Sequence, residues 1–407
     1  MCNFCCTFAP DNGFLKKMHN EINNMKWWHA AVIVFLSVAF AALFSSFLNS
    51  DFSSMEMFVP FQKKVDFRVT DIYNMMAEEQ SEREMSENVV VVGIDSLNRE
   101  QVLTLIDTIL LYEPIAIGLD IYFSIDKADN TTLMHTVENT PNMVNIIMVE
   151  HDKDRIHYIP DTLSFFYRSL TTVPHSGFAN LDVDHSWTVV RTFLPYVCTS
   201  AGDTIPNIAL ELAKIADPEK AQEAVRRGRS EEIIDFTHSV IDTISAERLA
   251  NPDVAERMRG KVVLIGVLKD PKDTYLTPLS EPAPGVLIHA YATQTILQGQ
   301  YIETRPEWIN WTVAVCLCLI LICLLLWANE SEKIGYAINL TTRVLMFVSL
   351  FILVYIGCRT FAQDHIYADY TPAITMLVFG MFAFDIVYAG YGLCRQLVLK
   401  KQTNSLR

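Results

Sequence analysis

Four long apolar stretches interrupt the chain, and one much longer polar segment separates the first stretch from the second. The apolar stretches cover residues 28–48, 308–329, 338–361 and 370–393. As helices they are long enough to cross the hydrocarbon core of a bilayer, which takes about 20 apolar residues. Trp308 and Trp327 lie near the ends of the second stretch and suit the headgroup zone. The pattern therefore predicts four transmembrane α-helices and one large domain, residues 49–307.

The first stretch has a second explanation as a cleaved signal peptide, because Ala39-Phe40-Ala41 resembles a cleavage site. However, the apolar run continues past this point to Leu48. A run of this length favours a retained membrane anchor.

The domain between the first two stretches contains short apolar runs that are typical of strands buried on both faces. These runs cover residues 89–94, 115–119, 144–149 and 262–266. Helical patterns separate the first three runs, and this alternation predicts a largely parallel sheet with helical crossovers. Residues 178–181 and 188–197 flank a polar turn and suggest an antiparallel addition to the sheet. The expected fold is an α/β domain with a mixed sheet.

The charge is distributed unevenly along the 407 residues, whose net charge is −15. Residues 49–307 contain 40 acidic and 22 basic side chains, whereas the remaining residues contain 7 and 10. Lysines precede the first stretch and basic residues follow the fourth, so the positive-inside rule places residues 1–27 and 394–407 in the cytoplasm. The large domain is then extracytoplasmic. The acidic balance excludes a general nucleic-acid binder.

Aspartates follow two of the predicted strands, and ligands in open α/β sheets bind at the carboxyl ends of strands. Asp95 and Asp120 end strands that look adjacent, and Asp273 and His289 follow a further strand. These side chains could bind a cation or a small polar ligand. Alternatively, the aspartates cap helices or hold loops, and His289 hydrogen-bonds the Thr277-Pro278 loop. No phosphate-loop, zinc-protease or serine-hydrolase motif occurs, so neither an enzyme nor a cofactor is expected.

Residues 260–266 are followed, in order, by Asp273, Thr277-Pro278, Gly285 and His289-Ala290. This segment resembles the type-two CHASE domain family of bacterial extracytoplasmic sensory domains. Two strands that end in Asp, residues 91–95 and 117–123, and a strand that carries Arg191 are also similar. His185-Ser186-Trp187 replaces the tight turn that is usual in the family.

The resemblance implies an architecture of one helix before the domain and three after it. The candidates for ligand binding, chosen from their positions at strand ends and in the loop and helix that follow, are Asp95, Asp120, Asp273, Thr277 and His289. Family members often continue into a kinase or cyclase, whereas this sequence ends shortly after the fourth stretch. We therefore expect the output to act through a separate protein or through the membrane helices themselves.

Asp385 is the only charged residue within the fourth stretch, and intramembrane carboxylates are costly and often functional. Arg343 lies in the third stretch at a similar expected depth, so the two side chains are expected to pair. Either a structural role or an ion path would explain such a pair. We favour a structural or coupling role.

These observations predict a multi-pass sensory protein of the bacterial cytoplasmic (inner) membrane. The expected partners are the membrane, an unidentified small ligand, a separate signalling or complex protein and, by analogy with the family, a second copy of the chain. One alternative is a structural subunit of an envelope complex that senses nothing. A second alternative is a metal-dependent enzyme that uses the strand-end aspartates.

Overall fold

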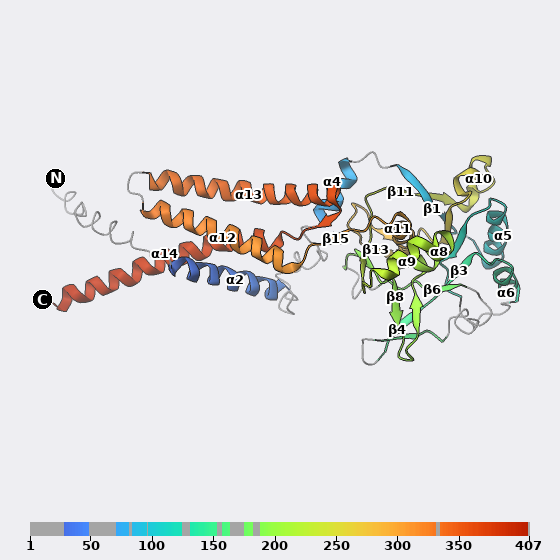
Figure 1. The fold of residues 1–407 in the computed structure, drawn as a ribbon, viewed down its shortest axis with the longest axis horizontal. Coiled ribbons are helices and arrows are strands. Elements are labelled where there is room, and N and C mark those ends of the chain that lie inside the picture. Colours follow the sequence, from blue (N-terminus) through green and yellow to red (C-terminus); the bar gives the residue numbers. More distant parts are fainter. Residues whose placement is uncertain are drawn as a thin grey trace, which may run out of the picture. The chain divides into compact units, whose positions relative to one another are not determined.

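The computed structural model describes residues 28–48, 71–80, 84–95, 97–123, 131–152, 157–162, 175–181, 188–330 and 334–405. The chain divides into two compact units (Figure 1). The helical unit takes in residues 1–62, 304–360 and 367–407, and the sheet unit takes in residues 63–303 and 361–366.

The sheet unit is built on a six-stranded sheet in which every neighbouring pair is parallel. In spatial order the strands are β11 (Val240–Ser245), β1 (Met85–Gly93), β12 (Val262–Gly266), β2 (Ala116–Leu119), β3 (Met143–Ile147) and β6 (Ser176–Phe178). The order confirms the largely parallel sheet. It also shows that β12 separates β1 from β2, so the strands that precede Asp95 and Asp120 are not adjacent.

Helices cover both faces of this sheet, which explains the uninterrupted apolar runs in its strands. Val89 and Val91 of β1 belong to the same core as α8 (Ile208–Ala216), α9 (Pro218–Arg226) and α11 (Gly285–Gln298). Val90 and Val92 belong to the core beneath α5 (Arg99–Leu110), α6 (Thr131–Glu138) and α10 (Pro252–Met258). Alternate residues of one strand thus fill two separate cores.

The antiparallel parts are short pairs outside this sheet. They are β4 (Val149–His151) with β5 (Tyr158–Pro160), β7 (Thr192–Phe193) with β10 (Glu232–Ile233), β8 (Tyr196–Cys198) with β9 (Thr204–Pro206), and β13 (Thr274–Tyr275) with β14 (Ala283–Pro284). The assignment of residues 178–181 to an antiparallel addition was wrong, because β6 pairs in parallel with β3 at the sheet edge. The unit also contains α4 (Asp71–Gln80), η3 (Ala246–Arg248) and η4 (Pro271–Asp273).

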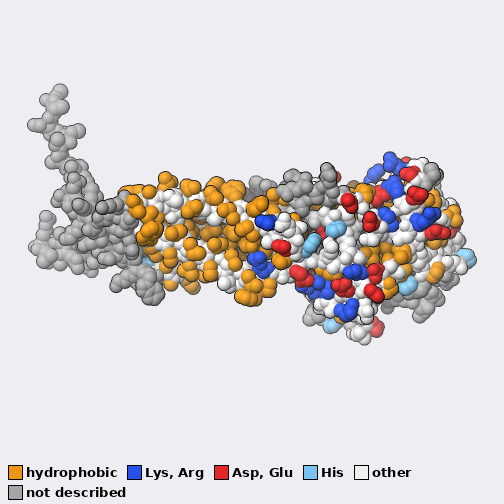
Figure 2. Space-filling view, turned by 45° about the horizontal axis from the view of Figure 1, so that its top comes forward, with side chains coloured by type: hydrophobic (Ala, Val, Ile, Leu, Met, Phe, Trp, Pro, Cys, Tyr) orange, Lys and Arg blue, Asp and Glu red, His pale blue; other side chains and the backbone are white. Residues whose placement is uncertain are grey.

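The helical unit contains α2 (Trp28–Leu48), α12 (Glu307–Glu330), α13 (Gly335–Asp364) and α14 (Thr371–Ser405), and β15 (Glu303–Thr304) pairs with β16 (Ile366–Tyr367). Segments of α12, α13 and α14, residues 307–329, 335–364 and 371–394, are long and apolar enough to cross a membrane. Hydrophobic side chains cover their visible surface, whereas charged side chains concentrate on the sheet unit (Figure 2). Three of the four predicted spans are thus confirmed as long apolar helices.

The helix α2 packs against α12 and α14, with Ile33 fully buried in their shared core. Its apolar part, residues 29–40, is shorter than the other three spans, so a fourth span stays a prediction. Helix α14 continues to Ser405, well past the predicted end at residue 393. The residues beyond 393 include Leu, Gln and Lys, which favour a helix as strongly as the apolar residues before them.

Candidate functional site

Two of the predicted site residues, Asp120 and Asp273, lie near the carboxyl ends of the central strands. Asp120 directly follows β2, and its backbone N–H donates to the Ile265 carbonyl of β12 at 2.9 Å. Asp273 ends η4, in the loop that leads from β12 to α11. This carboxylate faces the first residue of α11, because a Cβ added to Gly285 would lie 2.8 Å from Asp273 Oδ1. Glycine therefore lets the carboxylate approach the positive end of the helix dipole.

The two carboxyl groups influence each other. Burial raises the pKa of the Asp120 carboxyl to about 7. Burial, followed by the charge of Asp120, also raises the pKa of Asp273, against a hydrogen bond donated by the Tyr275 hydroxyl. The pKa of Tyr275 is raised to about 12 by its own burial and by the charge of Asp273. Because neighbouring carboxylates resist double ionisation, this pair can hold a proton near neutral pH.

His289 lies on α11 within the electrostatic reach of Asp273 and is only 3% exposed. Its Nε2 lies 2.9 Å from the carbonyl oxygen of Ala179, which comes just after β6. Burial lowers the pKa of the imidazole to about 4, so the ring is neutral and Nε2–H donates this hydrogen bond. The expected bond to the Thr277-Pro278 loop was wrong, because α11 presents this ring to the end of β6.

The other two predicted residues hold loops. Asp95 Oδ1 accepts the backbone N–H groups of Leu268 at 2.6 Å and Lys269 at 3.1 Å. Thr277 Oγ1 accepts the N–H of Leu279 at 3.3 Å and donates to the Glu281 carbonyl at 3.4 Å. The alternative that the aspartates serve loops is therefore correct for Asp95.

Tyr275 belongs to the site although the sequence reasoning did not select it. It stands two residues after Asp273 and forms part of β13. Asp273 ends η4, so the alternation of extended chain does not relate the two side chains, and no pattern in the sequence singled out Tyr275.

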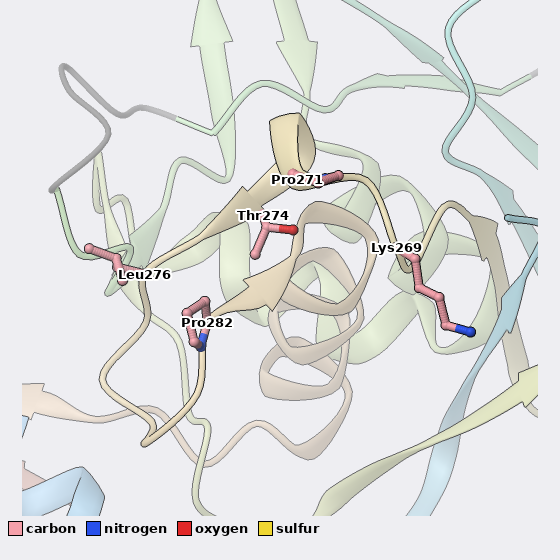
Figure 3. Close-up of a pocket in the computed structure, with 5 residues that line it drawn as sticks. All are labelled: Lys269, Pro271, Thr274, Leu276 and Pro282. Atoms are coloured by element: carbon pink, nitrogen blue, oxygen red, sulfur yellow. The ribbon is translucent and has the colours of Figure 1, made fainter.

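An open depression of about 490 Å³ borders the same loop. Its lining comes from η4, β13 and the chain on either side of them (Figure 3), and consists of Lys269, Pro271, Thr274, Leu276 and Pro282. Among the described residues, no three His, Cys, Asp or Glu side chains are placed to hold a metal ion. The depression therefore borders the loop that carries Asp273, although Asp120, Asp273, Tyr275 and His289 are not among its lining residues.

Replacing Asp120 with Asn is expected to stabilise the protein at pH 8. A carboxyl with a folded-state pKa of about 7 instead of 3.8 destabilises the fold when ionised, and this cost is complete above pH 7 and absent below pH 4. The gain in unfolding free energy at pH 8 should be about 2–4 kcal/mol, because each pKa unit corresponds to about 1.4 kcal/mol. Denaturant unfolding of both proteins at pH 8 and pH 4 measures it. Asp253→Asn, at an exposed site, is the control, and an Asp120→Asn variant less stable at pH 8 would contradict the expectation.

His289→Gln is expected to alter the acidic side of the profile of unfolding free energy against pH. With a folded-state pKa of about 4 against 6.5, the unfolded chain takes up a proton first, so stability falls as the pH drops from 6.5 to 4. Glutamine retains an N–H donor for Ala179 but does not titrate. The variant should therefore lose about 3 kcal/mol of pH dependence over this window. An unchanged slope between pH 4 and 6.5 would show that His289 is not the group responsible.

The predicted pair in the helical unit is present. Arg343 Nη2 donates to Asp385 Oδ1 at 2.8 Å and joins α13 to α14. Arg343 Nε also donates to Asn339 Oδ1 at 3.0 Å, one turn earlier on α13. Two opposite charges on apolar helices thus satisfy each other.

A parallel α/β unit followed along the chain by three long apolar helices is the organisation of a membrane protein with one large α/β domain. The CHASE2 domain model matches residues 33–328, and the chain belongs to this family of extracytoplasmic sensory domains. No curated protein and no solved structure matched the chain.

Proposed function

We propose that this protein is a sensor of the bacterial cytoplasmic membrane whose sheet unit lies outside and whose two termini lie in the cytoplasm, with α2 as a fourth span. The observation that carries the proposal is the group of Asp120, Asp273 and Tyr275 at the carboxyl ends of the central strands, next to the neutral His289. The family match and the apolar helices support it.

The signal in this proposal is a change in the charge state of the two carboxyl groups. A small cation or hydrogen-bond donor bound next to Asp273 favours the ionised pair, whereas acid favours the protonated pair. A ligand changes the conformation only through different affinities for two states, and the shared proton supplies such a difference. This account assigns the site no catalytic role: Asp95, the third carboxylate that the enzyme alternative requires, instead accepts the backbone N–H groups of Leu268 and Lys269.

The helices carry the change to a separate signalling protein. Arg343 and Asp385 are the candidate coupling residues, because their ion pair joins α13 to α14. A homodimer would place two such sets of helices side by side.

The test uses the intact protein in lipid nanodiscs, with Mg²⁺, Ca²⁺ and a series of small amines as probes at pH 5.5, 7 and 8.5. Thermal unfolding is followed for the wild type, for Asp120→Asn/Asp273→Asn and for the exposed-site control Asp253→Asn. We expect at least one probe to stabilise the wild type and the control in a pH-dependent way, and to have no effect on the double variant. Identical responses of all three proteins would refute the site.

The scaffold alternative makes a different prediction. A structural subunit would co-purify with a stoichiometric partner. The probes and the pH would then have the same effect on the thermal unfolding of the wild type and of the double variant. The same preparations therefore separate the two functions.

A further inference from the structure

The helix α4 begins at a buried ion pair that anchors it to the sheet unit. Arg191 Nε donates to Asp71 Oδ1 and Arg191 Nη2 donates to Asp71 Oδ2, both at 2.7 Å. The two side chains are 10% and 4% exposed. A two-point contact of this kind fixes the orientation of both partners. The first residue of α4 is thus held in a defined position.

The strand residues before Arg191 connect this ion pair to the candidate site. Val190 N–H donates to the Leu276 carbonyl at 2.8 Å, and Val189 forms a parallel bridge with Leu276. Leu276 directly follows Tyr275 and lines the depression. A second connection runs from the same loop, because the Ser280 N–H donates to Glu78 Oε2 of α4 at 3.0 Å. The loop after Asp273 is therefore connected to α4 at two points, directly at Glu78 and through Arg191 at Asp71.

Helix α4 also contacts the last turn of α13. Tyr73 is 1% exposed, and its ring centroid lies 6.1 Å from that of Phe361. Phe361 belongs to the sheet unit, as does His365, whose carbonyl accepts the Glu303 N–H at 2.8 Å. Glu303 comes shortly before α12, and residues 361–366 lead from α13 to α14. One connected set of contacts thus reaches the chain on both sides of the apolar helices α12 and α13.

We propose that α4 is the relay of this sensor: the Asp71–Arg191 pair positions α4 so that rearrangement of the Asp273–Ser280 loop is transmitted through Tyr73 to Phe361. The relay rests on the proposed function and specifies the path by which a change at the site reaches Phe361. Arg191 and Asp71 are positioning residues in this account and do not contact the ligand. Such a route requires an element whose position both ends influence, and only measured coupling can establish it.

The experiment is hydrogen–deuterium exchange on the intact protein in nanodiscs, with Asp273→Asn as the perturbation at the site. In the wild-type background we expect exchange to change by about fivefold in residues 71–80 and 361–366 as well as around residue 273. In an Arg191→Lys background, which keeps the charge but loses the two-point contact, the distant changes should disappear. The local change around residue 273 should remain.

Arg257→Lys is the matched control, because Arg257 makes a similar two-point contact with Asp242 between α10 and β11. It should leave the response of residues 71–80 and 361–366 to Asp273→Asn intact. If Arg191→Lys does not fold, Tyr73→Leu takes its place, and it should remove the response at 361–366 while sparing that at 71–80.

Two results would overturn the relay. One is an Asp273→Asn effect confined to residues near 273 in the wild-type background. The other is an equal loss of the distant response in Arg191→Lys and Arg257→Lys. Neither result touches the proposed function, since the probe measurements on Asp120→Asn/Asp273→Asn report on the site without α4.

Discussion

Replacing Arg191 with Ala is expected to lower the free energy of unfolding of the sheet unit by about 3–5 kcal/mol, because it removes the cation that donates two hydrogen bonds to a buried carboxylate. Asp71 is almost completely buried, and Arg191 supplies two of its hydrogen bonds. The loss is measured by urea unfolding of the intact protein, with limited proteolysis of the sheet unit as the readout. This loss is large compared with a typical domain stability of about 5–15 kcal/mol.

Two further variants separate the charge effect from general disruption. Arg229→Ala removes an ion pair with Glu303 that is partly exposed, and it should cost less than about 1 kcal/mol. Asp71→Leu combined with Arg191→Met removes both buried charges and should recover most of the stability. A double variant as unstable as Arg191→Ala would show that packing, and not the unpaired charge, accounts for the loss.

Replacing Arg343 with Ala is expected to destabilise the helical unit by about 2.5–3.5 kcal/mol, the cost of a charged side chain near the middle of a bilayer. The variant leaves Asp385 without the cation that lies 2.8 Å away. Thermal unfolding in nanodiscs and the amount of folded protein recovered from membranes both report the effect. Asp385→Ala should produce a similar loss by leaving Arg343 unpaired.

The double variant Arg343→Ala/Asp385→Ala should be more stable than either single variant, since it removes both charges. Arg359→Ala, near the end of α13, is the control and should have a small effect because a long basic side chain near a helix end can reach the interface. Additive losses in the double variant would be incompatible with a pair.

Features that depend on neighbouring residues in the chain were predictable. Runs such as residues 89–94 and 262–266 are strands because consecutive β-branched residues suit burial on both faces. The three long apolar helices follow from length and hydropathy alone. The pairing of Arg343 with Asp385 also followed, because two opposite charges in apolar helices have few other ways to be satisfied.

The membership of the candidate site was only partly predictable. Asp95 and Asp120 both follow buried strands, yet β12 lies between those strands and Asp95 serves the loop at Leu268. Strand order follows from how the whole chain packs, and no local pattern encodes it. The same holds for His289, whose partner at Ala179 is 110 residues away in the chain.

By itself, the sequence determined which segments are apolar helices, which are buried strands, and which residues carry the family motif, because periodicity, length and side-chain type are local properties. Only the tertiary structure decided that Asp273 lies within electrostatic reach of Asp120, and that Arg191 pairs with Asp71, 120 residues earlier. The strength of a charge–charge contact depends on distance and burial in space. Both quantities arise only when separate strands and helices pack together.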